Sequence, residues 1–408
     1  QMMRAGAKAW SHLSANLRLP NKGNWVRWVE ASRHDANTAY VAVDRHTYGD
    51  MTPYLYRTRD GGKSWSPLIG AATTGVRGYI HVIKEDSVNS NLLFAGTEFG
   101  MFISVDGGTS WAEFKPKDFP SVAVRDIVVQ ARDNDLVLGT HGRGIWIIDD
   151  ISPLRALDAG TLAATVKLLP SRATQQRLQG NGGWSDGDGK FSGDNPPGGA
   201  VITYYQKDRH IIGRMKLEIL DSEGNVVDTL PASKRRGLNR VEWSMRVKPP
   251  VAPPAAQLAF YSTQGPRVLP GRYTVRLTKA GETVTMPLDI GLDRRATFTV
   301  ADRKKQFDAA QRVSALFGRM SALVAGLKAT AEQSDAAAEK GGTTKTLAAS
   351  VSAQAAALKQ QVVATKEGGA ITGEERLREN MDVAYGAITS VESAPTNYQI
   401  ARIDALEK

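Results

Sequence analysis

The sequence has no cysteine among its 408 residues. Disulfides, thiolate metal sites and a cysteine nucleophile are therefore excluded. It also lacks an apolar run near the roughly 18–20 residues that a membrane-spanning helix needs. The first ten residues, QMMRAGAKAW, have no apolar core typical of a secretory signal. Because position 1 is Gln1, we expect the chain to begin inside a longer precursor.

Familiar catalytic signatures are absent as well. The sequence contains no Gly-x-Ser-x-Gly elbow, P-loop, His-Glu-x-x-His motif or dinucleotide fingerprint, and we expect no cofactor. Asp186, Asp188 and Asp194 lie in a stretch, 178–200, that is rich in Gly, Asp and Pro. A calcium loop would need an acid at its twelfth position, where Pro197 stands instead. We therefore predict a loop and no metal site.

The chain carries a net charge of +10 at pH 7. Its densest basic run, Lys234, Arg235, Arg236 and Arg240, lies between two segments that read as strands. A nucleic-acid interface would combine a basic face with interleaved aromatic residues. This run has none, so it indicates a solvated turn, and we predict no nucleic-acid partner.

One motif occurs twice. TRDGGKSW spans 58–65 and SVDGGTSW spans 104–111. Short apolar segments precede both copies, AYVAVD (39–44) and LLFAGT (92–97), and a third such segment, LVLGTH (136–141), leads into GIWIIDD (144–150). A period of 40–50 residues built from short strands is typical of a β-propeller, whose small sheets stack on their neighbours.

The repeated octet has a structural interpretation. An aspartate at the end of a strand accepts hydrogen bonds from the following turn, and a Gly-Gly pair allows positive φ angles. We therefore predict that the octets form strand-to-strand turns and that their aspartates are not catalytic. The residues of this structural set are Thr58, Asp60, Gly62, Ser64, Trp65, Ser104, Asp106, Gly108, Ser110 and Trp111.

The octet resembles the Asp-box of BNR-repeat propellers. Residues 1–156 resemble the closing blades of bacterial sortilin-like (VPS10-like) propellers, which are often labelled glycosyl hydrolases. The most specific stretch is VRDIVVQARDNDLVLGTHGRGIWIIDDISPLR at 124–155. The resemblance implies that the rest of the propeller lies upstream. It also implies a bacterial, extracytoplasmic location, which means periplasmic, cell-surface or secreted.

Two further regions follow. Short strands spaced 8–12 residues apart in 157–298 predict a small β-sandwich with an inserted Gly/Asp-rich loop. Its segments EILDSEGNVV and PGRYTVRLT resemble a FlgD-type Ig-like domain.

From 299 to 408 the apolar period becomes helical, with helices expected over 306–333, 345–366 and up to about 390. The fold class is therefore mainly β: a partial propeller, an Ig-like sandwich, and a helical hairpin or three-helix bundle that packs on itself or docks an assembly partner.

The connections 44–53, 97–100 and 140–144 occupy the same position in successive repeats. We expect them on one rim, where binding residues gather on a rigid scaffold. Arginine and histidine there could hold an acidic or sugar-like ligand, although His141-Gly142-Arg143-Gly144 also reads as a purely structural turn. The candidate ligand contacts are Arg45, His46, Glu98, His141 and Arg143.

These features predict a binding and interaction protein, a sortilin-like propeller that captures protein, peptide or glycan. The alternative is a glycoside hydrolase-like enzyme. Glycoside hydrolysis needs two carboxylates about 5–9.5 Å apart across the bond, and no spacing in this sequence sets up such a pair. In that alternative, the catalytic carboxylates would come from upstream blades.

Overall fold

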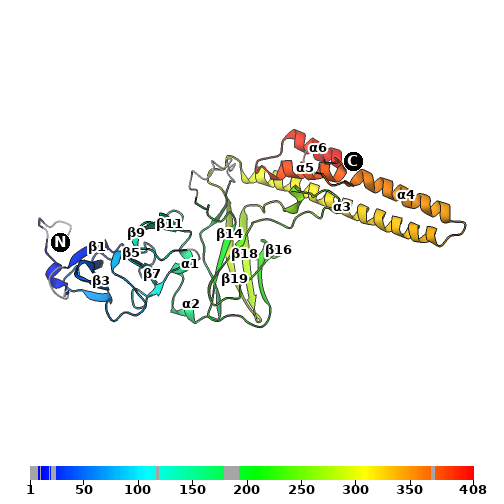
Figure 1. The fold of residues 1–408 in the computed structure, drawn as a ribbon. Coiled ribbons are helices and arrows are strands. Elements are labelled where there is room, and N and C mark those ends of the chain that lie inside the picture. Colours follow the sequence, from blue (N-terminus) through cyan, green and yellow to red (C-terminus); the bar gives the residue numbers. More distant parts are fainter. Residues whose placement is uncertain are drawn as a thin grey trace. The chain divides into compact units, whose positions relative to one another are not determined.

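The computed structural model describes residues 8–9, 11–17, 19, 24–115, 119–178, 193–368 and 373–408. Asp186 and Asp188 of the predicted loop lie outside these residues, whereas Asp194 is described and exposed. The chain divides into two compact units (Figure 1). Unit 1 comprises residues 1–172, 203–211 and 234–240, and unit 2 comprises 173–202, 212–233 and 241–408.

Unit 1 contains three small antiparallel sheets in which neighbouring strands follow one another in sequence, as in propeller blades. The first sheet is β1 (Trp25–Ala31), β2 (Ala39–Arg45), β3 (Asp50–Thr58) and β4 (Ser66–Ile69). The second is β5 (Ile80–Glu85), β6 (Leu93–Thr97), β7 (Gly100–Ser104) and β8 (Ala112–Glu113). The third is β9 (Val124–Gln130), β10 (Asp135–Thr140) and β11 (Ile145–Ile148). Short 3₁₀ turns lie at η1 (Ser14–Asn16) and η2 (His46–Tyr48).

The second sheet buries both of its faces. Leu93 and Ala95 pack with Leu55 and other side chains of the first sheet. Phe94, which points the other way from the same strand, packs with Leu136 and other side chains of the third sheet. Because successive side chains of a strand alternate between faces, a strand buried on both sides must be apolar throughout. This explains the unbroken apolar run in β6.

The two octets form the turns that join β3 to β4 and β7 to β8. Asp60 accepts hydrogen bonds from the backbone N–H of Ser64 at 2.9 Å and from its hydroxyl at 2.6 Å. Asp106 accepts the same pair from Ser110, at 2.9 and 2.5 Å. Gly108 has a φ of +92°, a conformation that glycine adopts without strain. The aspartates are thus engaged within their own turns.

A further hydrogen bond recurs in all three sheets. It runs from the turn after the third strand to the loop before the second: Gly61 N–H to Asn37 O (2.9 Å), Gly107 N–H to Asn91 O (2.9 Å) and Ile151 N–H to Asn134 O (2.8 Å). The third sheet therefore has the same hydrogen bond although it lacks the Asp-Gly-Gly octet. The three sheets are structural repeats of one another.

After β11 the chain forms two short helices, α1 (Ser152–Arg155) and α2 (Ala159–Ala163). Arg155 reaches back to the second sheet, where its Nε and one terminal nitrogen donate to the two carboxylate oxygens of Asp86 at 2.9 and 2.8 Å. The Asp86 side chain is fully buried and that of Arg155 is 12% exposed. A bidentate pair of this kind fixes geometry as well as contributing energy.

The strands predicted after residue 157 are present in two further sheets. Strands β12 (Val166–Leu169), β14 (Ala200–Gln206) and β17 (Gly237–Trp243) form one sheet in that order. A five-stranded sheet has the order β13 (Thr174–Gln176), β19 (Glu282–Leu292), β18 (Gly271–Lys279), β15 (Met215–Leu220) and β16 (Val226–Leu230). The pairs β12–β14, β15–β16, β15–β18 and β18–β19 are antiparallel, whereas β13 and β19 pair in parallel. The Ig-like identity of this region remains a prediction.

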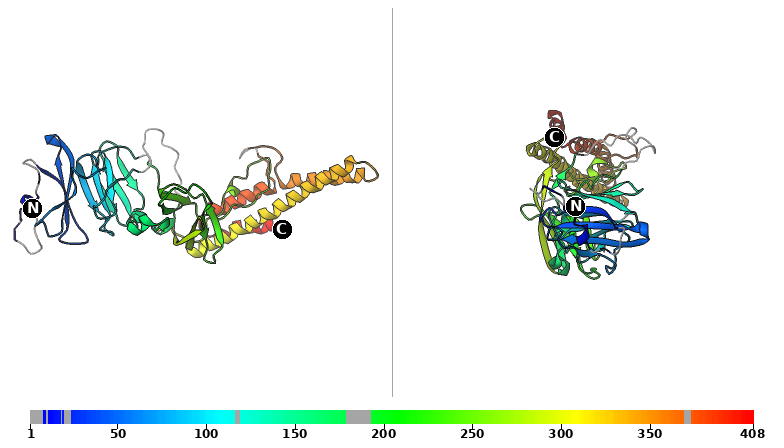
Figure 2. Two further views of the ribbon diagram at one scale, coloured as in Figure 1. Left: turned by 90° about the horizontal axis from the view of Figure 1, so that it is seen from below. Right: turned by 90° about the vertical axis from the view of Figure 1, so that its left-hand side faces the viewer.

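Unit 2 ends in helices α3 (Val300–Glu339), α4 (Lys345–Val362), α5 (Leu377–Thr389) and α6 (Asn397–Glu407). A capping box of Thr299 and Asp302 starts α3, and Gly341-Gly342, both at positive φ, turn the chain into α4. Figure 2 shows α3 and α4 side by side as a long hairpin. The sequence pattern predicted helices only up to about residue 390, so α6 is an additional element. No helix in the described part of the chain is long and apolar enough to cross a membrane.

We predict that Arg155→Ala lowers the free energy of unfolding by about 3 kcal/mol, because it leaves the buried Asp86 carboxylate without its charge partner. Urea unfolding followed by tryptophan fluorescence measures the change. The matched control is Arg132→Ala, since the Arg132 side chain is 66% exposed and its loss should change stability by less than about 0.5 kcal/mol. Equal effects of the two substitutions would contradict the role given to the Arg155–Asp86 pair.

Candidate functional site

The first strand of each sheet in unit 1 carries a bulge at the same place. In its pairing with the second strand, β1 has one extra residue at Arg27, β5 at His81 and β9 at Arg125. A bulge re-aims the side chain of its extra residue and is common beside functional sites. We call Arg27, His81 and Arg125 the bulge row.

The bulge row forms one electrostatic cluster. Strand β5 contacts β1 on one side and β9 on the other, and Figure 1 shows these strands in neighbouring sheets. Burial is the main cause of the lowered pKa of His81, and charge repulsion from Arg125 and Arg27 lowers this pKa further. The repeated sheets have thus placed Arg27 and Arg125 close enough to His81 for their charges to act on it.

Glu98, in the turn between β6 and β7, is the carboxylate of this cluster. It accepts a hydrogen bond from His81 Nε2 at 2.8 Å, and a terminal nitrogen of Arg125 lies 3.5 Å from the same oxygen. Burial alone would raise the pKa of Glu98, but hydrogen bonds from His81 and Tyr79 and the nearby charges outweigh burial and lower it. Glu98 is therefore an ionised acceptor at neutral pH and is poorly suited to act as a general acid, which needs a raised pKa.

His81 is held in its neutral form. Its side chain is only 1% exposed, and burial lowers its pKa despite the hydrogen bond to Glu98. A neutral imidazole that donates from Nε2 leaves Nδ1 as an acceptor. Within the described residues, Nδ1 of His81 and Nε of Arg125 are both buried without a hydrogen-bond partner.

Tyr79 connects this cluster to the loop that follows β2. Its ring stacks on His46 with 4.4 Å between centroids and meets His81 edge-on at 4.8 Å. The buried Asp44 orients His46 by accepting from its ring Nδ1 at 2.7 Å and from its backbone N–H at 2.9 Å. The site thus continues from the bulge row across two aromatic contacts to a half-exposed histidine.

The five residues selected from the sequence fall into different environments. Glu98 and His46 belong to the cluster. Arg45 is buried and is bound by Asp50 at 3.0 Å and Asn24 at 2.6 Å, which is a structural arrangement. His141 and Arg143 lie exposed in the turn between β10 and β11.

Sequence reasoning missed the bulge row and Tyr79. It aligned the second and third strands of each repeat but not the first. Aligning WVRWVE (25–30), YIHVIK (79–84) and AVRDIV (123–128) places Arg27, His81 and Arg125 in one column. A column of basic residues at the same position of three first strands is the pattern in the sequence that would have identified the bulge row.

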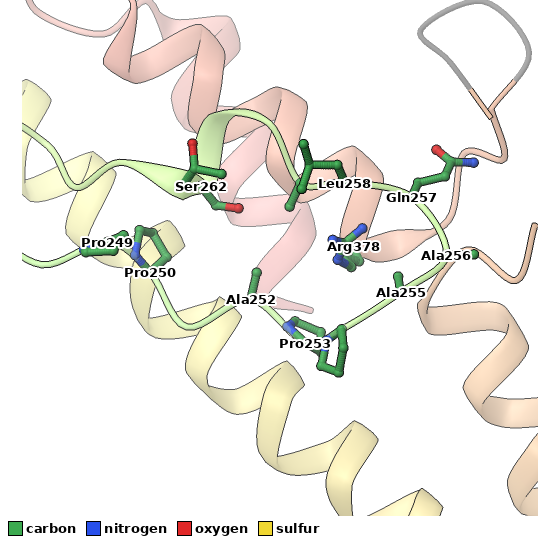
Figure 3. A pocket seen from close by; sticks show the side chains of 13 residues that line it. Pro249, Pro250, Ala252, Pro253, Ala255, Ala256, Gln257, Leu258, Ser262 and Arg378 are labelled. Carbon is green, nitrogen blue, oxygen red and sulfur yellow. The ribbon is translucent and has the colours of Figure 1, made fainter. Parts of the chain in front are cut away.

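The described part of unit 2 contains cavities of its own. Figure 3 shows one of about 520 Å³ inside the loop 249–263, with Arg378 at its centre. Arg378 donates to Glu379 at 2.6 Å, so its charge is already paired. A second cavity, of about 700 Å³, is lined by Arg246 and Arg267. Among the described residues, no cluster of three or more His, Asp or Glu side chains could hold a metal ion.

Comparison with known proteins does not assign a family. No protein-family model matches the chain, and no curated protein matches it. Among solved structures, YCF48 bound to D1 peptide matches with 15% identity over 39% of this chain at a TM-score of 0.20. The GH74 xyloglucanase from Xanthomonas campestris matches with 14% identity over 68% at a TM-score of 0.25, and an ancestral GH74 enzyme with 12% over 64% at 0.20.

The chain spans 64%, 38% and 35% of the lengths of these three proteins, respectively. Likenesses at such low TM-scores carry no argument about what this chain binds or catalyses. The interpretation of the site therefore rests on the geometry of the cluster itself.

We predict that the chain loses stability as the pH falls below 6.5 and that His81→Gln removes part of this loss. Because the pKa of His81 is lower in the folded chain, the unfolded chain binds more protons between that pKa and 6.5. The free energy of unfolding therefore rises with pH in this window, by at most about 1.4 kcal/mol per pH unit for one proton. Urea unfolding at several pH values between 5 and 7.5 measures the slope. Identical slopes for both proteins would contradict a buried, neutral His81.

Proposed function

We propose that residues 1–156 are part of a β-propeller whose first strands bind an acidic segment of a protein, peptide or glycan, and that this chain is an interaction protein. The observation that carries the proposal is the bulge row. The blades of a propeller surround a central channel, and in a meander blade one edge strand borders that channel. Side chains at equivalent bulges of successive first strands would then line it.

The charges of the cluster favour an anionic ligand. Among the described residues, Arg27 has no carboxylate partner; its guanidinium lies 5.5 Å from the ring centroid of Trp25. Glu98 offsets the charge of Arg125 through the contact at 3.5 Å, so the charge of Arg27 remains. A guanidinium beside an exposed aromatic ring provides a charge-assisted donor and an apolar surface in one place.

Open apolar faces support the proposal that further blades complete the ring. On the face of the third sheet that is directed away from the second, Val128, Val137 and Ile147 form one cross-strand row. Val128 and Ile147 are 50% and 59% exposed. At the other end of the series, Val29 of β1 is also exposed, at 60%. Contiguous apolar surface on a sheet indicates a packing partner, and we propose that upstream blades supply it.

The glycosidase alternative receives less support from this cluster. Hydrolysis needs a protonated carboxylic acid and a second carboxylate facing one bond. The lowered pKa of Glu98 keeps it ionised, and Asp44 is occupied by His46. A hydrolytic site would therefore need both carboxylates from other blades.

Assembly with a partner and a location outside the cytoplasm are two further proposals. Assembly through the C-terminal helices is supported by an exposed apolar row on α4, formed by Leu347, Val351 and Leu358. A location outside the cytoplasm rests on the resemblance of residues 124–155 to sortilin-like propellers.

We predict that the chain binds a fluorescein-labelled peptide rich in Asp and Glu and that the double substitution Arg27→Glu, Arg125→Glu weakens this binding at least about tenfold. Each charge-assisted hydrogen bond that is lost costs roughly 1.5–3 kcal/mol, and binding should fall with added salt. Fluorescence anisotropy measures the dissociation constant.

The matched control is Arg59→Glu, Arg132→Glu, which changes the net charge equally at exposed positions of the same unit. Comparable weakening by both double variants would show that only the overall charge matters, and the assignment to the bulge row would then be wrong. Release of reducing ends from an acidic glycan incubated with the chain would instead favour the enzyme alternative.

A further inference from the structure

Unit 2 contains a cavity of about 700 Å³ whose charges are not balanced. Four segments of the unit line it: Leu178 after β13, the loop after β17, the residues just before α3, and the C-terminal end of α5 with the residues that follow. Its volume lies within the range of small-molecule sites, about 300–1,000 Å³. All of its lining residues belong to unit 2.

Two arginines, Arg246 and Arg267, line this cavity together with Glu392, and a third, Arg303, contacts Arg267 without lining the cavity itself. Arg267 is paired with Glu392 at 2.7 Å, and its side chain is 10% exposed. Arg303 is fully buried beneath it and donates to the backbone oxygen of Arg267 at 3.1 Å. Arg246 lies opposite Arg267 in a β-bridge, and among the described residues its one hydrogen-bond acceptor is the backbone oxygen of Gly265, at 2.8 Å.

The arrangement leaves positive charge unneutralised in a partly desolvated place. A guanidinium keeps its proton in proteins, so Glu392, which pairs with Arg267, cannot neutralise all three positive charges. Burial and the neighbouring Arg267 lower the pKa of Arg246. Within the described residues, Nε of Arg303 is buried without a hydrogen-bond partner. An unpaired buried charge is costly until an anion or an acceptor reaches it.

The rest of the lining indicates what the anion is attached to. Gln264, Thr297 and Ser393 offer amide and hydroxyl groups, which both donate and accept hydrogen bonds. Phe260 and Tyr261 are exposed at the cavity and meet edge-on at 5.3 Å. Hydroxyl partners together with aromatic surface suit a small polyhydroxylated ring better than a bare ion.

We propose that this cavity binds an acidic sugar, with the ligand carboxylate on Arg246 and Arg267 and its hydroxyl groups on the polar lining. The planar fork of a guanidinium matches a carboxylate in a bidentate manner. The cavity shown in Figure 3 provides a contrast, because its Arg378 is neutralised by Glu379 and offers no free charge. The site lies in unit 2 and is independent of the bulge row.

The test uses the full chain with sodium glucuronate as the probe and glucose as the uncharged comparison, by isothermal titration calorimetry. We expect saturable binding of glucuronate and none of glucose at the same concentrations. Arg246→Gln should weaken glucuronate binding at least about tenfold, the loss of one charge-assisted contact. Arg214→Gln, at an exposed position of the same unit, should leave binding unchanged.

A second variant should increase the affinity for glucuronate. It distinguishes a direct role of these residues in binding from a role in folding. Glu392→Gln removes the negative charge that competes for Arg267, so glucuronate should bind more tightly. The double substitution Arg59→Glu, Arg132→Glu, at exposed positions of unit 1, should leave glucuronate binding intact. Absence of glucuronate binding, equal binding of glucose, or weaker binding by Glu392→Gln in a chain with unchanged circular dichroism would each overturn the proposal.

Discussion

The burial of both faces of the second sheet is the constraint on which unit 1 depends. Leu93 and Ala95 of the second sheet pack against the first sheet, and Phe94 packs against the third. Because protein interiors are closely packed, neither neighbour can slide without opening a void against these side chains. A buried hydrogen bond also joins the first two sheets. The hydroxyl of Tyr40 in β2 donates to the carboxylate of Glu85 in β5 at 2.8 Å.

The bulge row follows from this packing. Each first strand would place its side chains regularly on two faces if it paired without interruption. Each sheet has one extra residue in its first strand, namely Arg27, His81 or Arg125. The extra residue changes the direction in which its side chain points. The stacking of the sheets then brings two of these bulge residues, His81 and Arg125, to the carboxylate of Glu98. The aspartate turns at Asp60 and Asp106 use their carboxylates within the turn itself, so the repeat that is most conspicuous in sequence is separate from the cluster.

Unit 2 shows how differently the same residue type is used. Arg312 on α3 holds α6 through Asp404 at 2.7 Å and Glu407 at 2.7 Å, so its charge is balanced twice. Arg246 has no such carboxylate within hydrogen-bond range in the described part of the chain. Buried arginines normally persist because they are paired, and an excess of them beside an open cavity therefore marks a place where an anion is expected.

The sequence by itself determined what depends on neighbouring residues. Short apolar segments located strands such as β2, β6 and β10, the Asp-Gly-Gly spacing located the turns, and the change to a helical period from residue 299 located α3. These properties depend on interactions over a few positions. It missed α6, which is only 11 residues long and is held by the distant Arg312. Only the tertiary structure decided that Glu98 joins His81 and Arg125, and that Arg246 and Arg267 line one cavity with Glu392. Those contacts join segments that the chain brings together only when its sheets and helices pack.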